Sequence, residues 1–86
     1  MRVSIYPHDS GYVTWRHVLA AGNSVIVKFN GVPNYECVTA DSEAGMIVCL
    51  ARDNAGKLIW DDARQALADR VAHGRVEIEI HERKVL

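Results

Sequence analysis

The side chains with the widest chemical repertoire in this sequence are its four histidines and two cysteines. They stand at His8, His17, His73, His81, Cys37 and Cys49. Zinc sites use these ligand types at short spacings such as Cys-x-x-Cys or His-x-x-x-His. Neither spacing occurs here, and each cysteine is many residues away from any histidine. We therefore expect no metal site and no cofactor, and histidines that are solvated or bonded locally.

The two cysteines fall in two neighbouring predicted strands. A disulfide between Cys37 and Cys49 would require a register that brings their Cβ atoms within about 4.5 Å. The alternative is a pair of buried thiols that act as small apolar side chains. Since the N-terminus shows no secretion signal, we expect reduced thiols and a cytoplasmic protein, either in a host cell or associated with a virion.

Carboxylates and serines show no pattern of a catalytic or cation-binding site. Asp61 and Asp62 stand together at the start of a predicted helix, where they complement the helix dipole, but two acids fall short of the six or more oxygens that calcium takes. Asp41 and Glu43 fall in a turn and are expected to be solvated. No serine has a Gly-x-Ser-x-Gly setting, and no glycine-rich phosphate loop occurs. We expect the protein not to be an enzyme.

The composition narrows the classes of partner. The chain has 86 residues, of which 49% are hydrophobic, which predicts one small domain over residues 1–86. Its net charge of −1 and pI of about 6.4 give no strong field for phosphates, so nucleic acid is an unfavoured partner. The apolar runs are far shorter than the roughly 20 residues that span a bilayer, so we expect no membrane association.

The first third of the chain predicts a strand followed by a helix. Residues 2–6 alternate polar and apolar side chains up to Pro7. Asp9 or Ser10 can then cap a helix that ends near Gly22-Asn23. Its apolar positions recur at helical spacing and are Tyr12, Trp15, Val18 and Leu19. The β-branched residues of this segment leave open an irregular or partly extended conformation over residues 10–22.

The middle of the chain predicts strands joined by three tight turns. Residues 24–29 form a β-branched run, Asn30-Gly31 suits a primed hairpin turn, and residues 32–40 are extended with an edge or a bulge at Pro33. Two further turns begin with Asp and end with Ala-Gly, over residues 41–45 and 53–56. The last of them lies inside the apolar segment 46–60, which predicts a β-hairpin. Three such turns in succession imply an antiparallel meander.

The end of the chain predicts a second helix and a final strand. The helix begins at Asp61 or Asp62 and ends near His73-Gly74. Its inner face would consist of Ala63, Ala66, Leu67, Arg70 and Val71. Beyond it, residues 76–80 alternate apolar and polar side chains, as in a strand with one buried face, and the tail from residue 81 to residue 86 is expected to fray. We predict an α+β fold: a small antiparallel β-sheet meander with two short helices packed on one face.

Three residues are candidates for contact with a partner. Trp15 and Arg16 place an aromatic ring beside a positive charge, and the break at Pro33-Asn34 could turn Tyr35 either outward to a partner or inward to the core. With the basic tail that includes His81, Arg83 and Lys84, the first pair suggests a small nucleic-acid-binding regulator as the alternative function. The other aromatics, Phe29 and Trp60, lie in apolar strand runs and are expected in the core.

The middle segment carries one resemblance to known proteins. Residues 37–58, CVTADSEAGMIVCLARDNAGKL, resemble a segment of short uncharacterised proteins encoded by phages and prophages. In those proteins an aromatic helical segment precedes a strand and turn like residues 25–32, VIVKFNGV, and a strand like Arg75-Val76-Glu77 ends the chain. The resemblance implies a phage-derived gene near morphogenesis functions and supplies no catalytic residues.

A protein interaction is the leading functional hypothesis. A small sheet offers either an edge strand or the polar face of its last strand to another chain, because an edge presents unpaired backbone groups. The partner could be another protein or a second copy in a homodimer. We therefore expect a non-enzymatic phage- or prophage-derived accessory or structural protein that acts through protein–protein contacts.

Overall fold

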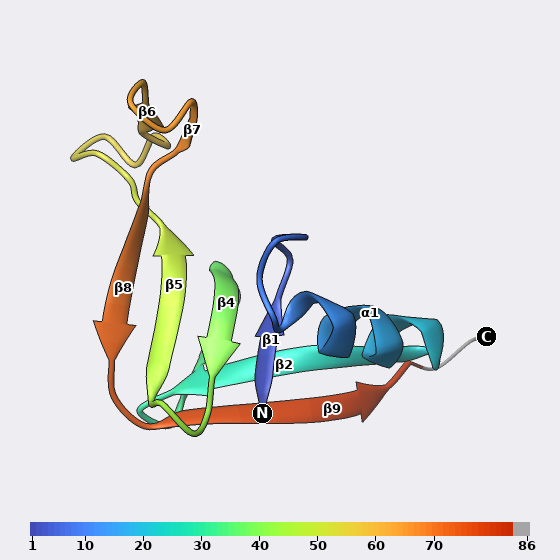
Figure 1. Cartoon of the computed structure of the whole chain (residues 1–86). Helices are drawn as coiled ribbons and strands as arrows, with labels where there is room; N and C mark the ends of the chain where they lie inside the picture. The colour runs from blue at the N-terminus through green and yellow to red at the C-terminus, as the bar shows by residue number, and fades with distance from the viewer. Residues whose placement is uncertain (84–86) are drawn as a thin grey trace.

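Strands dominate the structure, and they form two larger sheets and one small one (Figure 1). The computed structural model describes residues 1–83. The elements, in chain order, are β1 (Arg2–Ser4), α1 (Tyr12–Ala20), β2 (Asn23–Phe29), β3 (Val32–Asn34), β4 (Cys37–Asp41), β5 (Met46–Leu50), β6 (Trp60–Asp61), β7 (Ala66–Leu67), β8 (Asp69–His73) and β9 (Val76–Glu82). The first sheet has the strand order β1-β4-β5-β8, the second has the order β3-β2-β9, and β6 pairs with β7 alone. Every strand pair is antiparallel. The prediction of antiparallel strands is confirmed, whereas the prediction of a single meander is wrong.

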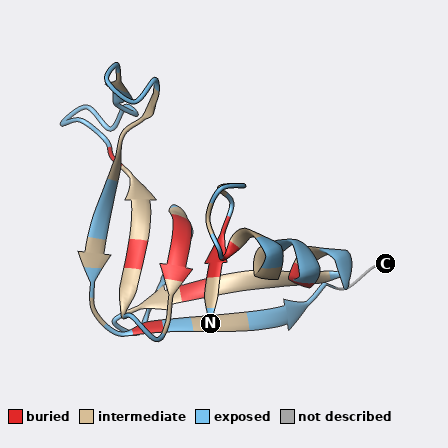
Figure 2. Ribbon diagram, in the orientation of Figure 1, coloured by how far each residue is buried: buried red, intermediate tan, exposed pale blue. Residues whose placement is uncertain are grey.

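The hydrophobic core lies where the first and second sheets face each other. Its buried members are Val3, Ala40 and Ile47 from the first sheet and Val27 and Val76 from the second. Figure 2 shows these buried positions where the strands of the first sheet meet β2 and β9. In contrast, residues 52–60 are all exposed and project beyond the core. We call residues 52–68 the arm and the rest of the described chain the body.

Helix α1 confirms the predicted helix but begins differently from the prediction. Its N-cap is Gly11, which makes no side-chain cap bond. Asp9 is therefore not the cap: its carboxylate accepts the Gly11 N–H at 2.7 Å and pairs with Arg2 at 2.7 Å. A Cβ at Gly11 would lie 2.8 Å from the carbonyl carbon of Val3. Only glycine permits this close approach, which places the start of α1 directly on β1.

The hairpin between β2 and β3 confirms the predicted Asn30-Gly31 turn. Both turn residues have positive φ, 51° at Asn30 and 83° at Gly31, as a primed turn requires. After Asn34 the chain leaves the second sheet, because the Asn34 side chain accepts the Glu36 N–H and bends the backbone. Strand β4 then joins the first sheet. The predicted meander is wrong at this point, since the break at Pro33-Asn34 is a crossing between sheets.

The turn over residues 41–45 joins β4 to β5, as predicted. Asp41 is not simply solvated, because its carboxylate accepts the N–H groups of Glu43 and Ala44 and also binds Arg2. The N–H bond from Ala44 is the main cause that lowers the pKa of Asp41 below its usual range. This carboxylate therefore closes the hairpin and ties it to β1.

The arm begins with the predicted Asp53–Gly56 turn, but the hairpin around it is short. The Asp53 side chain accepts the N–H groups of Ala55 and Lys57. The two sides of this hairpin form no strand pair: they share an isolated bridge between Arg52 and Leu58 and two flanking backbone bonds, from Asp53 to Lys57 and from Ile59 to Ala51. The sequence predicted that residues 46–50 pair with the segment that ends at Trp60. This prediction is wrong, because β5 pairs with β4 along one edge and with β8 along the other.

The second predicted helix, over residues 61–73, does not form. Asp61 accepts the N–H groups of Ala63 and Arg64 as a helix cap would, but the chain makes one turn and Gln65 adopts a φ of 51°. The predicted inner face of this helix is divided: Ala63 lies in the turn, residues 66–67 form β7, and Arg70 and Val71 belong to β8. Five residues of β8 pair with β5. Pairing satisfies the backbone along a whole strand edge, which an isolated short helix cannot match.

Strand β9 confirms the predicted final strand. It pairs with β2 over seven positions, from Val76 opposite Phe29 to Glu82 opposite Asn23. Val76 is buried, while burial decreases along the strand and leaves Ile80 exposed. His81 lies in β9, and residues 84–86 of the expected tail lie outside the described residues. Across residues 1–83, no helix combines the length and the apolar character that a membrane crossing needs.

Candidate functional site

The most distinctive surface of the body is an unpaired edge of β2. Strand β2 runs from Asn23 to Phe29, but β3 covers it only from Val27 to Phe29. The Asn30 N–H donates to the Arg75 carbonyl on the β9 side. Successive residues of a strand direct their backbone N–H and C=O groups to opposite sides, so every second residue of β2 faces β9 and the residues between them face β3. By this alternation the backbone groups of Val25 and Asn23 face the side that β3 leaves open. No described strand pairs with β2 there.

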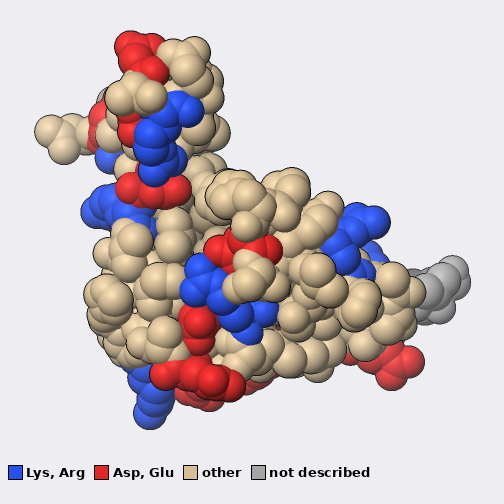
Figure 3. Space-filling view, in the orientation of Figure 1, with Lys and Arg blue, Asp and Glu red and all other residues tan. Residues whose placement is uncertain are grey.

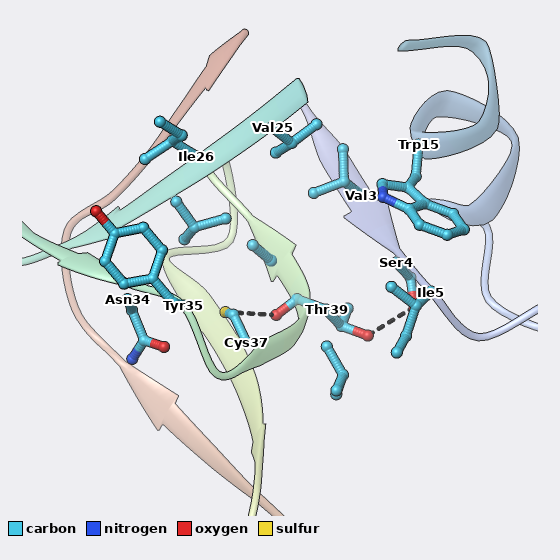
Figure 4. A pocket seen from close by; sticks show the side chains of 13 residues that line it. Val3, Ser4, Ile5, Trp15, Val25, Ile26, Asn34, Tyr35, Cys37 and Thr39 are labelled. Atoms are coloured by element: carbon cyan, nitrogen blue, oxygen red, sulfur yellow. Dashed lines mark hydrogen bonds between the residues drawn. The ribbon is translucent and has the colours of Figure 1, made fainter. Parts of the chain in front are cut away.

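A pocket of about 150 Å³ lies along this open edge (Figure 4). We call it the edge pocket. Its lining consists of Val3, Ser4, Ile5, Trp15, Val25, Ile26, Val27, Asn34, Tyr35, Cys37, Val38, Thr39 and Ala40. It thus occupies the space between the end of β3 and helix α1, with β1 and β4 as its other wall. An engineered apolar cavity of about 150 Å³ holds a benzene-sized group, so the edge pocket has room for one apolar side chain.

The structure brings two of the three predicted contact residues to the edge pocket. Trp15 reaches it from α1, where its ring also packs against the core. Tyr35 reaches it from the bend after β3 and is 82% exposed, which decides in favour of the outward alternative. Arg16 is exposed on α1 but does not line the pocket. Trp15 and Tyr35 therefore line the same pocket, at its opposite ends (Figure 4), whereas Arg16 does not line it.

Three polar residues of the edge pocket bond to one another. The hydroxyls of Ser4 and Thr39 lie 2.7 Å apart in the buried floor, and the Cys37 thiol donates to the Thr39 carbonyl at 3.4 Å. Figure 4 shows both interactions on one wall of the pocket. In residues 1–83 no buried side-chain nitrogen or oxygen lacks a hydrogen-bond partner. A floor satisfied in this way favours the burial of an apolar group over proton transfer.

Charged side chains of β2 and β9 are paired across the second sheet. Lys28 of β2 contacts Glu79 of β9 at 2.9 Å, and Glu79 also binds His81 at 2.9 Å. The bond from Lys28 is the main cause that lowers the pKa of Glu79, and the same bond raises the pKa of Lys28. On the face in Figure 3, basic and acidic side chains lie in small mixed clusters. The electrostatic surface therefore shows no continuous basic field there.

A second pocket, of about 590 Å³, separates the arm from the loop after β1. We call it the arm pocket. Asp69 lies in its wall, where it accepts a bond from Arg64 at 3.2 Å and a longer one from the Tyr6 hydroxyl at 3.5 Å. Burial, and after it the charge of Asp69, raises the pKa of Tyr6. The His8 ring stacks on Tyr6 with centroids 5.5 Å apart. Of these contacts, the bond from Arg64 to Asp69 joins the arm to the body, and the others lie within the body.

Sequence reasoning missed the residues that make the edge pocket a site. Ser4, Val25 and Thr39 show no motif, and they come together only because β1, β2 and β4 meet at one corner of the core. One signal was present in the sequence. Pro33 indicated that the extended segment 32–40 is interrupted, and this interruption is what exposes the edge of β2.

Neither a set of metal-binding residues nor a comparison with known proteins adds to this description. Among residues 1–83, no three His, Cys, Asp or Glu side chains gather into a set that could hold a metal ion. The edge pocket and the open edge of β2 therefore define the candidate site by geometry alone. Comparison of this chain with protein-family models, with curated proteins and with solved structures finds no match.

Proposed function

We propose that this protein binds an extended segment of another protein chain at the open edge of β2, as a non-enzymatic accessory or structural protein. Strand addition uses backbone groups for affinity and side-chain pockets for specificity. The structure provides both at one place: the backbone of Val25 faces an open edge, and the edge pocket lies beside it. This juxtaposition is the observation that carries the proposal.

The geometry also defines the chemistry of the partner. The added strand would continue the line of β3 along residues 23–26 of β2 and place one apolar side chain in the edge pocket. Trp15 and Tyr35 would contact the bound segment from opposite ends of the pocket. Rigid aromatic side chains commonly contribute the largest share of binding energy in such contacts. A segment with alternating apolar and polar residues fits this site best.

The biological setting remains a proposal that rests on resemblance. The similarity of residues 37–58 to short phage and prophage proteins suggests a partner from the same genetic context. A second copy of the chain is one form of such a partner, because any sheet edge can pair with another. The nucleic-acid alternative has no comparable support, since Arg16 lies away from the pocket that Trp15 lines.

A peptide selection tests the proposal. The immobilised protein is used to select from a library of random peptides with alternating apolar positions, and the affinities of the selected peptides are then measured by fluorescence anisotropy. We expect the substitution Tyr35→Ala to weaken binding by about tenfold or more, because it removes the outer wall of the pocket. Val32→Ala is the matched control, since Val32 is 66% exposed on β3 but does not line the pocket.

Three outcomes would count against the proposal. The library could yield no binder, Val32→Ala could weaken binding as strongly as Tyr35→Ala, or the selected peptides could contact only the arm. Sedimentation of the protein alone over a range of concentrations measures self-association. A dimer that Tyr35→Ala dissociates and Val32→Ala leaves intact would identify a second copy as the occupant of the edge.

A further inference from the structure

Two thiols face each other across the middle of the first sheet. Cys37 of β4 and Cys49 of β5 occupy directly opposed positions in the register of the two antiparallel strands. Side chains at opposed positions project from the same face of a sheet, with Cβ atoms about 4.5–5.5 Å apart. A disulfide needs Cβ atoms about 3.5–4.5 Å apart. A small adjustment of the two strands therefore suffices to join the two sulfur atoms.

The strand at this position has the freedom for such an adjustment. The register of β4 and β5 shifts between Cys37 and Thr39, so Cys37 lies next to a β-bulge. Bulges interrupt the ladder and let the strand bend locally. Cys37 also follows the bend at Tyr35 and Glu36, where the chain crosses from one sheet to the other. It is thus less constrained than a residue inside a regular ladder.

Both cysteines line pockets of the described surface. Cys37 lines the edge pocket, and Cys49 lines a separate pocket between β5 and the end of β3. Each is half-buried, and no disulfide joins them in the structure. Their present contacts are weak: Cys37 donates to the Thr39 carbonyl at 3.4 Å, and Cys49 lies 3.8 Å from the Asn34 amide nitrogen. Formation of a disulfide would cost little in lost hydrogen bonding.

We propose that Cys37 and Cys49 form a reversible cross-strand disulfide when the protein meets a low-molecular-weight disulfide such as oxidised glutathione. One thiolate attacks a sulfur of the small disulfide, which forms a mixed disulfide and releases one small thiolate. The other cysteine thiolate then attacks the protein sulfur of the mixed disulfide, forms the Cys37–Cys49 bond and releases the second small thiolate. The protein loses two electrons and two protons, and the small disulfide is reduced to two thiols.

The raised pKa of Cys37 disfavours the thiolate that this exchange needs. Burial raises its pKa to about 12, and the neighbouring Cys49 thiol adds to the effect. Each cysteine acts once as the nucleophile, whichever attacks first, so the Cys37 thiolate is needed in one of the two steps. The bond therefore forms slowly near neutral pH and leaves the thiols reduced during brief exposure to an oxidant.

Mass spectrometry of the intact chain tests the proposal. The full chain is incubated with oxidised glutathione, quenched with acid, unfolded and treated with an alkylating reagent. We expect a main product that has lost two hydrogen atoms and carries neither glutathione nor alkyl label. Cys37→Ala and Cys49→Ala should each accumulate one glutathione adduct. Wild-type protein that accumulates glutathione adducts, or that keeps both thiols free for alkylation, would overturn the proposal.

The same exchange, repeated in a denaturant, shows whether the disulfide is favoured by the folded structure or only by the short loop between the two cysteines. If the native register favours the bond, its exchange equilibrium with glutathione should be more favourable in the folded protein by on the order of a hundredfold. An equilibrium that is equal or less favourable in the folded protein would show that the register opposes the bond. This measurement uses only the wild-type chain, so it does not depend on whether the variants fold.

Discussion

The body and the arm of this molecule are stabilised by different kinds of interaction. In the body, Ala40 is 0% and Ile47 is 2% exposed, and both sheets contribute to one core. In the arm, Trp60 is 55% exposed, and the turns are closed by Asp53 and Asp61, whose carboxylates bond to nearby backbone N–H groups. Burial of apolar side chains thus stabilises the conformation of the body, whereas local hydrogen bonds stabilise the conformation of the arm. The difference predicts that substitutions in the two regions have very different effects.

The largest effect is expected in the core. Ile47→Ala should lower the free energy of unfolding by about 2–5 kcal/mol, because it leaves a cavity between the two sheets. Urea denaturation followed by tryptophan fluorescence and circular dichroism measures the change. Ile47→Val is the matched control and should cost about 1 kcal/mol. A cost below about 1 kcal/mol for Ile47→Ala would mean that the two sheets are not packed as described.

The next effect is expected at the contact between α1 and β1. Gly11→Ala should cost about 1–3 kcal/mol, because the new methyl group would meet the backbone of Val3, which cannot move aside as a side chain could. Ser10→Ala is the control, since Ser10 is exposed. If the two variants unfold at the same urea concentration, α1 does not begin in direct contact with β1.

A moderate, pH-dependent effect is expected from the pair of Arg2 and Asp9. The hydrogen bond from Arg2 is the main cause that lowers the pKa of Asp9 to about 2, from 3.8. The folded state therefore gains stability above pH 3.8 and loses it as the pH falls towards 2. Asp9→Asn can still accept the Gly11 N–H but carries no charge. We expect it to cost roughly 1–2 kcal/mol at neutral pH.

The same variant should also show a flatter decrease of stability across that acidic range. Thermal unfolding of the wild type and of Asp9→Asn at several pH values measures both slopes. Parallel slopes would show that the ionisation of Asp9 does not contribute to the stability of the body.

The smallest effect is expected in the arm. Trp60→Ala removes a large side chain, yet it should change the free energy of unfolding by less than about 1 kcal/mol, because the ring is already in contact with water. Urea denaturation followed by circular dichroism gives the value. A cost similar to that of Ile47→Ala would remove the distinction between arm and body.

The sequence was sufficient for elements whose signals are local and unopposed. The Asn30-Gly31 turn, α1 and β9 follow from residue types that suit one conformation, and the structure contains all three. The segment 61–73 shows where local signals fail. Asp61 does bond like a helix cap, but the free edge of β5 offers Asp69–His73 a longer-range pairing that no local pattern displays. Trp60, expected in the core, is exposed in β6, which pairs with β7 in the arm.

The candidate site was predictable only in part. Trp15 and Tyr35 could be selected as aromatic residues beside a basic residue and a chain break, and both line the edge pocket. That both line one pocket could not be predicted, because it depends on β3 ending at Asn34 and on β4 joining the other sheet. The open edge of β2 has the same origin. It is a property of strand pairing, and no residue type marks it.

Backbone hydrogen exchange at Val25, measured by NMR, tests the open edge of β2 most directly. In the free protein, we predict that the Val25 amide exchanges about a hundredfold faster than the amides of Ile26 and Lys28, which face β9. Addition of a selected peptide should slow Val25 by about tenfold or more and leave the arm unchanged. A Val25 amide as protected as its two neighbours in the free protein, or unchanged by a bound peptide, would contradict strand addition at this edge.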